Sequence, residues 1–452
     1  MKTLLERVKG SQLDVHASHR VPATAMTLLA PHAKQIKYLD FVYNYWVDIQ
    51  RFSELNPGPF PLLRTLIINA IIGNSSDAWT PPSLPLFSNA VNLTEFRLHT
   101  WMSPFLSHFA FPNLTAFELS VTTDEGFHAS QILDFLEASP LLRTVRILIN
   151  AVASLEGIPQ ERVVVLPNVE TISLVACDYM PCYTIASHVA CPSAKHTSLM
   201  HEDRVDHVLP EEAFPTSVSW NAIAGQYGRS RAEEVTFEIK VTPNHAITCS
   251  LSFQSPDATI IELCFKVTTD RNQGWSRLRM SFARSYHDIF SQALGTIRDH
   301  PQLANIKRLH IRCHSSITLI PSSHLLPRIA GDVGRLFESM GPLEELSIYH
   351  CDLRPYLFPF LDLPGFDVEQ PVVFPPTKKF TVSYPLSVSP DDFVAALVGL
   401  VKSQHTLGVP FEHVAVRMVD LPAAMVEGLN PWVDTAEYYH ARHVGDDDFG
   451  SI

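Results

Sequence analysis

The sequence predicts an α/β fold, a solenoid in which parallel strands stack into one curved sheet with helical or irregular segments on its outer side. Three observations support this prediction. A short apolar phrase recurs at nearly regular spacing, proline or asparagine often precedes it, and amphipathic helical segments lie between several of its copies. Alternation of strands and helices along a chain is the pattern of α/β proteins.

The recurring phrase is an apolar residue, two free positions, an apolar residue, one free position and a third apolar residue. Steps between its first six copies are 27, 30, 21, 28 and 27 residues. This is the LxxLxL core of a leucine-rich repeat, whose period is about 20–29 residues. The copies are Ile36-Leu39-Phe41, Leu63-Leu66-Ile68, Leu93-Phe96-Leu98, Leu114-Phe117-Leu119, Leu142-Val145-Ile147, Val169-Ile172-Leu174, Ile306-Leu309-Ile311 and Leu343-Leu346-Ile348.

The spacing of the phrase explains why its copies should stack. Side chains alternate along a strand, so the second and third apolar residues point to the same side. The first reaches the core from the preceding turn, where a proline loses no ladder hydrogen bond. One such strand cannot bury its own face, so neighbouring copies form a parallel sheet. The full motif places Asn or Cys five residues after the second apolar residue, as at Asn44, Asn150, Cys177 and Cys351.

Helical segments are expected between strands. Ser130 is predicted to cap a helix over 131–138, and the patterns over 287–297 and 329–340 predict two more. The clearest is SPDDFVAALVGLVKSQ, residues 389–404, in which Ser389 caps and Pro390 occupies the first turn. Its predicted buried stripe is Phe393, Ala396, Leu397, Leu400 and Val401.

The phrase does not run evenly along the chain. We expect N-terminal repeats over 1–200, divergent repeats or an insertion over 201–300, C-terminal repeats over 301–440 and a disordered acidic tail over 441–452. Strands are expected at 233–241 and 258–267, although the repeat spacing is poor there. The proline-rich segment 353–380 predicts a long loop.

Composition narrows the class of protein. The 452 residues are 46% hydrophobic, which supports a large buried core. The net charge of −13, without a cluster of Lys and Arg, argues against nucleic acid and anionic membrane as partners. There is no signal-peptide pattern and no run of 18 apolar residues, and the seven cysteines are irregularly spaced. We therefore expect a protein of the cytoplasm or nucleus, with no nucleic-acid or membrane partner.

One stretch raises the question of metal binding, because it holds Cys177, Cys182, His188, Cys191 and His196. Structural zinc usually pairs its ligands as C-x2–4-C, and these spacings fit only loosely. The nearby MHEDRVDH places its second histidine six positions after the first, whereas a metalloprotease helix needs four. We predict no catalytic residue, no metal site and no cofactor. The alternative is a hydrolase or metalloprotein that uses region 177–300.

Several phrases resemble a known family. They are LLERVKGSQLDVH, MTLLAPHAKQIKYLDF, DIQRFSEL with PFPLLRTLIINA, and ILDFLEASPLLRTVRI. Their order resembles the large F-box-like leucine-rich-repeat family of mushroom-forming fungi. The resemblance implies that an N-terminal F-box docks on the adaptor of a cullin-type ubiquitin ligase while the repeats capture a substrate. No F-box is recognisable before the repeats, so a ligase adaptor is expected as a partner only if an F-box lies upstream.

The free positions on the strands should point away from the core, to the concave face. They mix charges, hydroxyls and some apolar groups, as protein-recognition surfaces do. We therefore predict a non-catalytic protein–protein interaction module, acting in substrate recognition for a ubiquitin ligase or as a binding scaffold unrelated to ubiquitination. A solvated face without a partner is the other interpretation. The candidate binding residues are Arg97, His99, Glu118, Arg146, Ser173, Arg308, His310, Arg312 and Tyr349.

Overall fold

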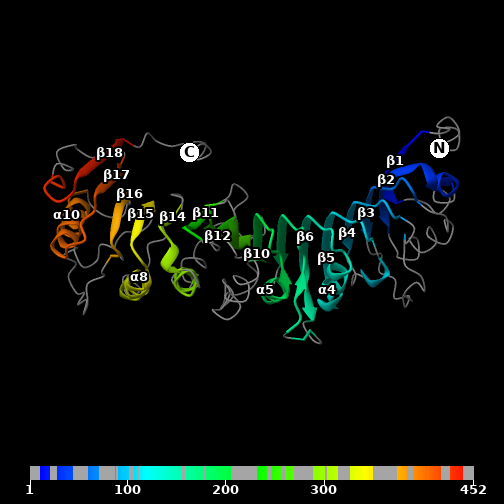
Figure 1. The fold of residues 1–452 in the computed structure, drawn as a ribbon, viewed down its shortest axis with the longest axis horizontal. Coiled ribbons are helices and arrows are strands. Elements are labelled where there is room, and N and C mark those ends of the chain that lie inside the picture. The colour runs from blue at the N-terminus through cyan, green and yellow to red at the C-terminus, as the bar shows by residue number, and fades with distance from the viewer. Residues whose placement is uncertain are drawn as a thin grey trace. The chain divides into compact units, whose positions relative to one another are not determined.

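A computed structural model gives the arrangement of the chain (Figure 1). By residue contacts the chain divides into two compact units. Unit 1 comprises Met1–Glu202 with Gly225–Arg229, and unit 2 comprises Asp203–Ala224 with Ser230–Ile452. The structure describes residues 11–20, 28–43, 60–70, 87, 90–100, 106–109, 111–154, 158–159, 161–176, 179–204, 232–241, 246–256, 260–268, 289–300, 303–313, 326–349, 374–383, 390–418 and 428–440.

Unit 1 is built on a parallel sheet with the strand order β1-β2-β3-β4-β5-β6-β8-β10. Its strands are β1 (Leu13–Arg20), β2 (Ile36–Tyr43), β3 (Thr65–Ala70), β4 (Glu95–Thr100), β5 (Ala116–His128), β6 (Thr144–Ser154), β8 (Thr171–Ala176) and β10 (His196–Arg204). The short strands β7 (Val164–Val165) and β9 (Val189–Ala190) pair separately. The connections include α4 (Ser130–Glu137), α5 (Tyr179–Ser187) and the 3-10 turns η1 (Ala30–Gln35) and η2 (Leu106–His108).

Unit 2 has the strand order β13-β12-β11-β14-β15-β16-β17-β18. Its strands are β11 (Glu234–Val241), β12 (Ala246–Gln254), β13 (Ile260–Thr268), β14 (Arg308–Cys313), β15 (Leu343–Tyr349), β16 (Thr377–Ser383), β17 (His413–Met418) and β18 (Thr435–His440). From β11 through β14 to β18 every neighbouring pair is parallel, whereas β11, β12 and β13 form an antiparallel meander. Helical segments are 289–298, η3 (Leu303–Asn305), α8 (Leu326–Ser339) and α10 (Pro390–Thr406).

The apolar phrase forms the core of both units. In all eight copies the second and third apolar residues lie on a strand, and every residue of the phrase is at most 2% exposed. The strands are in register, so that Leu66 pairs with Phe96 and Phe96 with Phe117. Equivalent positions therefore form continuous apolar rows across the strands. The predicted α/β class with largely parallel sheets is confirmed.

Four further strands use the same spacing, with all their core positions buried. Three escape a search for large apolar residues because alanine or threonine takes one or two of the three positions. The fourth, FEHVAV, satisfies the apolar pattern completely and follows a proline, so the sequence contained the signal for it. These copies are Ala194-Thr197-Leu199, Ala232-Val235-Phe237, Thr377-Phe380-Val382 and Phe411-Val414-Val416.

Helices cover the apolar side of each sheet, as α4 and α5 do in unit 1 (Figure 1). Phe135 of α4 lies 4.4 Å from Phe117 of β5, measured between ring centroids. In unit 2, Phe290 packs edge-on against Phe237 of β11 at 5.5 Å. The other face of each sheet carries the free positions of the phrase. We call it the open face.

In unit 1, three of the turns that precede strands are each tied to a neighbouring turn by an asparagine, and we call these contacts the asparagine ladder. The side-chain amides of Asn92, Asn113 and Asn168 donate to the carbonyls of Pro61, Val91 and Pro140. Each donor stands one residue before the first apolar residue of its phrase, and each acceptor stands two before. The ladder gives a physical reason for the asparagines that precede the phrase, because each supplies a hydrogen-bond donor to a turn carbonyl.

Most of the helix and strand predictions are confirmed. Strands β11 and β13 lie where 233–241 and 258–267 were expected, helix α8 covers most of 329–340, and the five predicted residues of the α10 stripe are at most 2% exposed. Helical structure is also found over 289–298, where the pattern predicted it. Strand β12 was not expected, and it lies between the other two strands of the meander.

Two local predictions are wrong. Ser130 is not the cap of α4: Ala129 occupies the N-cap position and no side chain caps the helix. The loop expected over 353–380 ends earlier, because β16 begins at Thr377, where Phe380 and Val382 are buried as in the other strands. The predictions for 353–373, for Ser389, for the tail 441–452, and for Asn44, Cys177 and Cys351 lie outside the described residues.

Candidate protein-binding face

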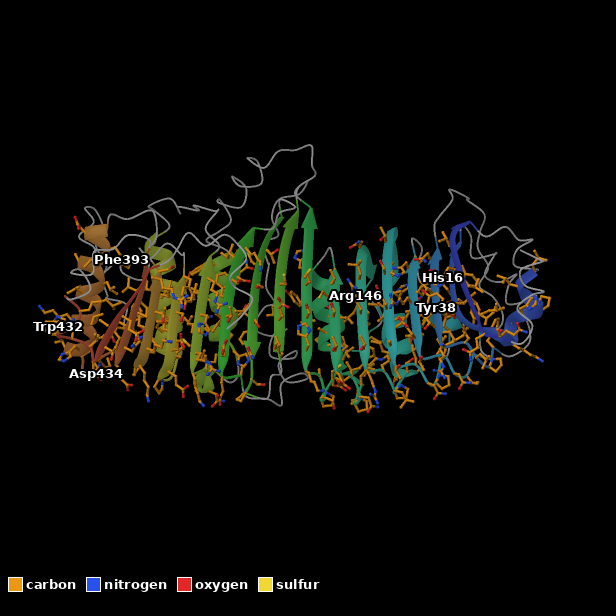
Figure 2. The ribbon with its side chains drawn as sticks, turned by 90° about the horizontal axis from the view of Figure 1, so that it is seen from above. His16, Tyr38, Arg146, Phe393, Trp432 and Asp434 are labelled. Carbon is orange, nitrogen blue, oxygen red and sulfur yellow. The ribbon has the colours of Figure 1, made fainter. Side chains whose placement is uncertain are left out.

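In unit 1 the predicted binding residues stand on adjacent strands at free positions of the phrase, and one of them, Arg146, is labelled in Figure 2. Strand register places Arg97 of β4 beside Glu118 of β5, and Glu118 beside Arg146 of β6. Ser173 of β8 follows Arg146 in the same row. Alternation explains this placement, since each of these residues stands between two buried apolar residues of its own strand. The sequence therefore predicted the neighbourhood of these four residues correctly.

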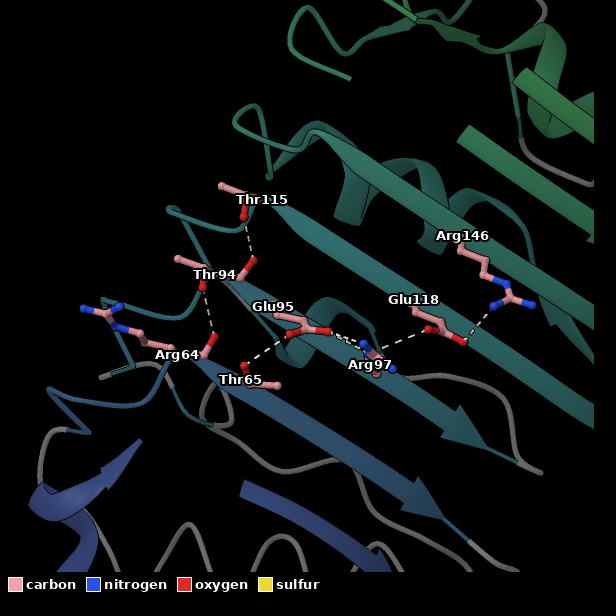
Figure 3. A network of polar contacts seen from close by, with 8 residues as sticks. All are labelled: Arg64, Thr65, Thr94, Glu95, Arg97, Thr115, Glu118 and Arg146. Carbon is pink, nitrogen blue, oxygen red and sulfur yellow. Dashed lines mark hydrogen bonds and ion pairs between the residues drawn. The ribbon is translucent and has the colours of Figure 1, made fainter. Parts of the chain in front are cut away.

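A row of opposite charges crosses these strands (Figure 3). The Arg97 guanidinium donates from Nε to Glu95 Oε1 at 2.7 Å, and its Nε lies 3.7 Å from Glu118 Oε2. On the far side of Glu118, Arg146 Nη1 lies 3.8 Å from Oε1. The hydrogen bond to Glu95 raises the pKa of Arg97. Arg146 ends the row, and its side chain is 63% exposed.

Polar groups continue the row toward β2 and β1. Thr65 donates its hydroxyl to Glu95 Oε2 at 3.2 Å, and the Asn69 amide donates to Asp40 at 3.2 Å. His16 of β1 lies 3.9 Å from the Asp40 carboxylate and packs on the Tyr38 ring at 4.5 Å (Figure 2). This end of the face is thus rich in acceptors, while Arg146 places a cation at the other end.

His99 lies on β4 one alternation beyond Arg97, and it is half-buried. Burial lowers its pKa, and the neighbouring Arg97 and Arg146 lower it further, although Glu118 acts in the opposite direction. A histidine with a lowered pKa is neutral near pH 7, where one ring nitrogen donates and the other accepts a hydrogen bond. His99 therefore adds a neutral hydrogen-bonding group to a charged surface.

The other predicted residues lie on the open face of unit 2, on β14 and β15. Arg308 donates from Nε to Glu234 Oε2 of β11 at 2.8 Å. His310 Nε2 lies 3.6 Å from Glu234 Oε1, but His310 is only 7% exposed. Burial lowers the pKa of His310 although Glu234 raises it. His310 therefore contributes less accessible surface than the sequence pattern suggested.

Tyr349 of β15 lies between two arginines. The guanidinium carbon of Arg312 on β14 is 5.8 Å from the ring centroid, and that of Arg417 on β17 is 5.1 Å away. Next to this group, Lys379 of β16 lies 3.5 Å from the Glu345 carboxylate. The sequence pattern did not reveal Glu234, Lys379 or Arg417, because the strands that carry them were not recognised as copies of the phrase.

The cysteine and histidine stretch has structural contacts of its own. The Cys182 thiol lies in α5 and donates to the Leu174 carbonyl at 3.5 Å, and the His188 Nδ1 lies 2.6 Å from the Arg162 carbonyl. Burial raises the pKa of both Cys182 and Cys191 to about 12, which keeps them as thiols near neutral pH. Within the described residues no three His, Cys, Asp or Glu side chains are grouped to hold a metal ion.

The fold and this face define an α/β protein with a polar, charge-paired sheet surface. A search against protein-family models found no family that matches the chain. A search of curated proteins found no significant relative. In the described part of the chain, no helix is both long enough and apolar enough to cross a membrane.

Proposed function

We propose that this chain is a non-catalytic protein-binding module built from stacked leucine-rich repeats, and that the open face of unit 1 contacts the partner. The repeat assignment is supported by the LxxLxL spacing, by the burial of its residues and by the parallel register of successive copies. Leucine-rich repeats bury one side of each strand in the solenoid and leave the other side free for recognition.

The main support for the proposal is the charge row from Glu95 to Arg146. Exposed ion pairs stabilise a fold by only about 0–1 kcal/mol each, so folding gains little from this arrangement. A protein partner that covered the row would exclude water and make each charged contact stronger and more selective. The row also serves cross-strand pairing, because opposite charges on neighbouring strands are favourable. Among the described residues, the one ion pair of Arg146 at the exposed end of the row is the 3.8 Å contact with Glu118.

The test is affinity capture from native cells with the tagged full chain, followed by quantitative mass spectrometry. The face variant carries Arg97→Glu and Arg146→Glu. The control variant carries Arg64→Glu and Arg143→Glu, which change the net charge equally at exposed positions at the starts of strands. We expect the control to retain the wild-type partners and the face variant to lose them by about tenfold or more.

The same comparison can contradict the proposal. Equal recovery with the two variants would show that the face does not bind the captured proteins. Circular dichroism and thermal melting must first show that both variants are folded. Neither substitution introduces a charge into the buried core, so both are expected to melt within a few degrees of wild type.

We further propose substrate recognition in an F-box-type ubiquitin ligase as the cellular context, which rests on the family resemblance alone. A binding scaffold unrelated to ubiquitination is the competing context. Capture with a verified full-length transcript separates them. Recovery of ligase adaptor and cullin supports the ligase context, and their consistent absence together with recovery of other partners supports the scaffold.

A further inference from the structure

The turns that precede the strands of unit 1 carry apolar side chains on their exposed tips. The pentapeptide Pro-Leu-Leu-Arg-Thr occurs twice, over 61–65 and 140–144, and each copy places one leucine in the core and the other toward solvent. The exposed leucines are Leu62 and Leu141, at 39% and 44% exposure, and Val91 on an intervening turn is 51% exposed. These side chains lie outside the core, so burial in the fold does not explain why they are apolar.

The asparagine ladder brings these tips into one line. The amides of Asn92 and Asn113 donate to the carbonyls of Pro61 and Val91, so successive turns lie side by side. Exposed prolines continue the line between and beyond the apolar tips, at Pro112, Pro140, Pro167 and Pro192. Single exposed apolar side chains are common on protein surfaces, but a row of them along one edge marks a contact surface.

A row of charged and hydroxyl side chains runs beside these tips, at the starts of the strands. Each member donates its backbone N–H to the carbonyl of the member before it, at 2.7–2.9 Å. In order, the row is Lys37, Arg64, Thr94, Thr115, Arg143, Glu170 and Lys195. Figure 3 shows Arg64, Thr94 and Thr115 following one another at the strand starts. Four cations and one carboxylate give the row a charge of 4 − 1 = +3, on a chain whose net charge is −13.

Little in the described part of the chain neutralises these cations. No carboxylate of the described residues lies within ion-pair distance of Lys37 or Arg64. Glu170 serves two cations, because its oxygens lie 4.0 Å from Arg143 Nη1 and 3.2 Å from Lys195 Nζ. The Arg143 and Lys195 side chains are 68% and 73% exposed. Exposed pairs of this kind are weak, so the row presents a positive field to solvent.

We propose that this edge of unit 1 binds the surface of an anionic phospholipid membrane, with the apolar tips in the interface and the cations among the lipid headgroups. Charge complementarity selects this occupant, since anionic headgroups attract Lys and Arg while exposed apolar side chains enter the boundary of the acyl chains. Neighbouring strands are roughly 4.8 Å apart, so the row extends over roughly 29 Å and faces many headgroups at once. Leu62 and Leu141 each stand two residues before an arginine of the row, which places both kinds of contact together.

The expectation of no membrane partner came from the overall charge and from the lack of a Lys and Arg cluster in the sequence. Strand pairing assembles such a cluster from residues that are far apart in the chain. Charges more than about 10 Å away are largely screened at physiological salt, so the local charge of the edge governs this contact. The inference goes beyond the proposed function, because it concerns the turn edge of unit 1 and not the open face.

The test is sedimentation of the full chain with lipid vesicles. The vesicles contain equal parts of phosphatidylserine and phosphatidylcholine, and vesicles of phosphatidylcholine alone are the matched probe. We expect binding to the anionic vesicles only, weakened by added salt. Arg64→Gln and Arg143→Gln should each weaken binding by about fivefold, since each removes one cation from the membrane surface. Leu62→Ser and Leu141→Ser should each weaken binding severalfold and leave its salt dependence unchanged, because they remove apolar contact alone.

Two variants of unit 2 serve as matched controls. Lys378→Gln removes a cation from the equivalent strand-start position of β16, where the neighbouring strands carry Glu344 and Glu412. Leu407→Ser removes an apolar side chain that is 58% exposed. Both variants should bind the anionic vesicles as wild type does. Circular dichroism must show that every variant keeps the wild-type fold, as substitutions at exposed positions normally do.

Several outcomes would overturn the inference. These are no binding of wild type to the anionic vesicles, equal binding to phosphatidylcholine alone, or an equal loss in Lys378→Gln. Stronger binding to a peptide of Glu-Gly repeats than to the vesicles, lost in Arg64→Gln and Arg143→Gln, would assign the edge to an acidic protein segment instead. The vesicles contain no protein, so their failure leaves the capture result on the open face unaffected. Arg64 and Arg143 are the control positions of that capture, so the two experiments probe different surfaces.

Discussion

Replacing Val145 with Asp should unfold unit 1, because this side chain stands in the middle of the buried apolar row. Val145 is fully buried, and its register partners are Phe117 on β5 and Ile172 on β8. The substitution loses about 2 kcal/mol of apolar burial. It also buries a carboxylate without a partner, which costs several kcal/mol more or forces the group to take up a proton. The total approaches the roughly 5–15 kcal/mol that stabilises an ordinary protein.

Urea unfolding followed by circular dichroism measures the effect, with Thr144→Asp as the matched control. Thr144 is the preceding residue on β6, but it is exposed, so the same carboxylate should change the free energy of unfolding by less than about 1 kcal/mol. Val145→Ala keeps the effect measurable if the Asp variant does not fold, with an expected loss of about 2 kcal/mol. Equal midpoints for Val145→Asp and Thr144→Asp would refute the assignment of faces along β6.

Two further predictions concern stability. Asn113→Ala removes the 2.7 Å hydrogen bond to the Val91 carbonyl and should lower the free energy of unfolding by about 1 kcal/mol. Ser193→Ala changes the equivalent exposed position of a later copy and should have no effect. Similar changes in the free energy of unfolding for the two variants would argue against the asparagine ladder. Burial lowers the pKa of His300 to about 4 in the folded chain. Between about pH 6.5 and pH 4 the unfolded chain therefore binds more protons at this residue than the folded chain does. The free energy of unfolding consequently falls as pH falls, by up to roughly 3 kcal/mol. Urea unfolding of His300→Phe at pH 7 and pH 4.5 should show a smaller pH dependence than wild type, and an unchanged dependence would contradict this role of His300.

Prediction from the sequence succeeded where the apolar phrase is regular. Each copy indicates which residues are buried and, by alternation, which residues lie on the open face. The sequence alone therefore placed Arg97, Glu118 and Arg146 side by side. It failed where small or polar residues replace an apolar one, and it also missed the fully apolar copy Phe411-Val414-Val416. Thr197 and Thr377 are buried at such positions, and a pattern search that requires large apolar residues passes over them.

Other features depend on contacts that no local pattern contains. The contact between the Tyr349 ring and Arg417 joins residues far apart in the sequence, and it spans the strand that carries Ser383. His310 likewise stands at a free position of the phrase but is only 7% exposed, which its position in the phrase did not indicate. Side-chain direction was therefore predictable from alternation, while accessibility and pairing were not.

Site-specific crosslinking can show directly whether the open face of unit 1 contacts a protein partner. A photoreactive benzoylphenylalanine is placed at position 146 on the open face or at position 137, the exposed Glu137 of α4 on the helical side. After irradiation in native cells, we predict a covalent product of defined mass from position 146 and none from position 137. A product from position 137 alone would contradict the proposed binding face.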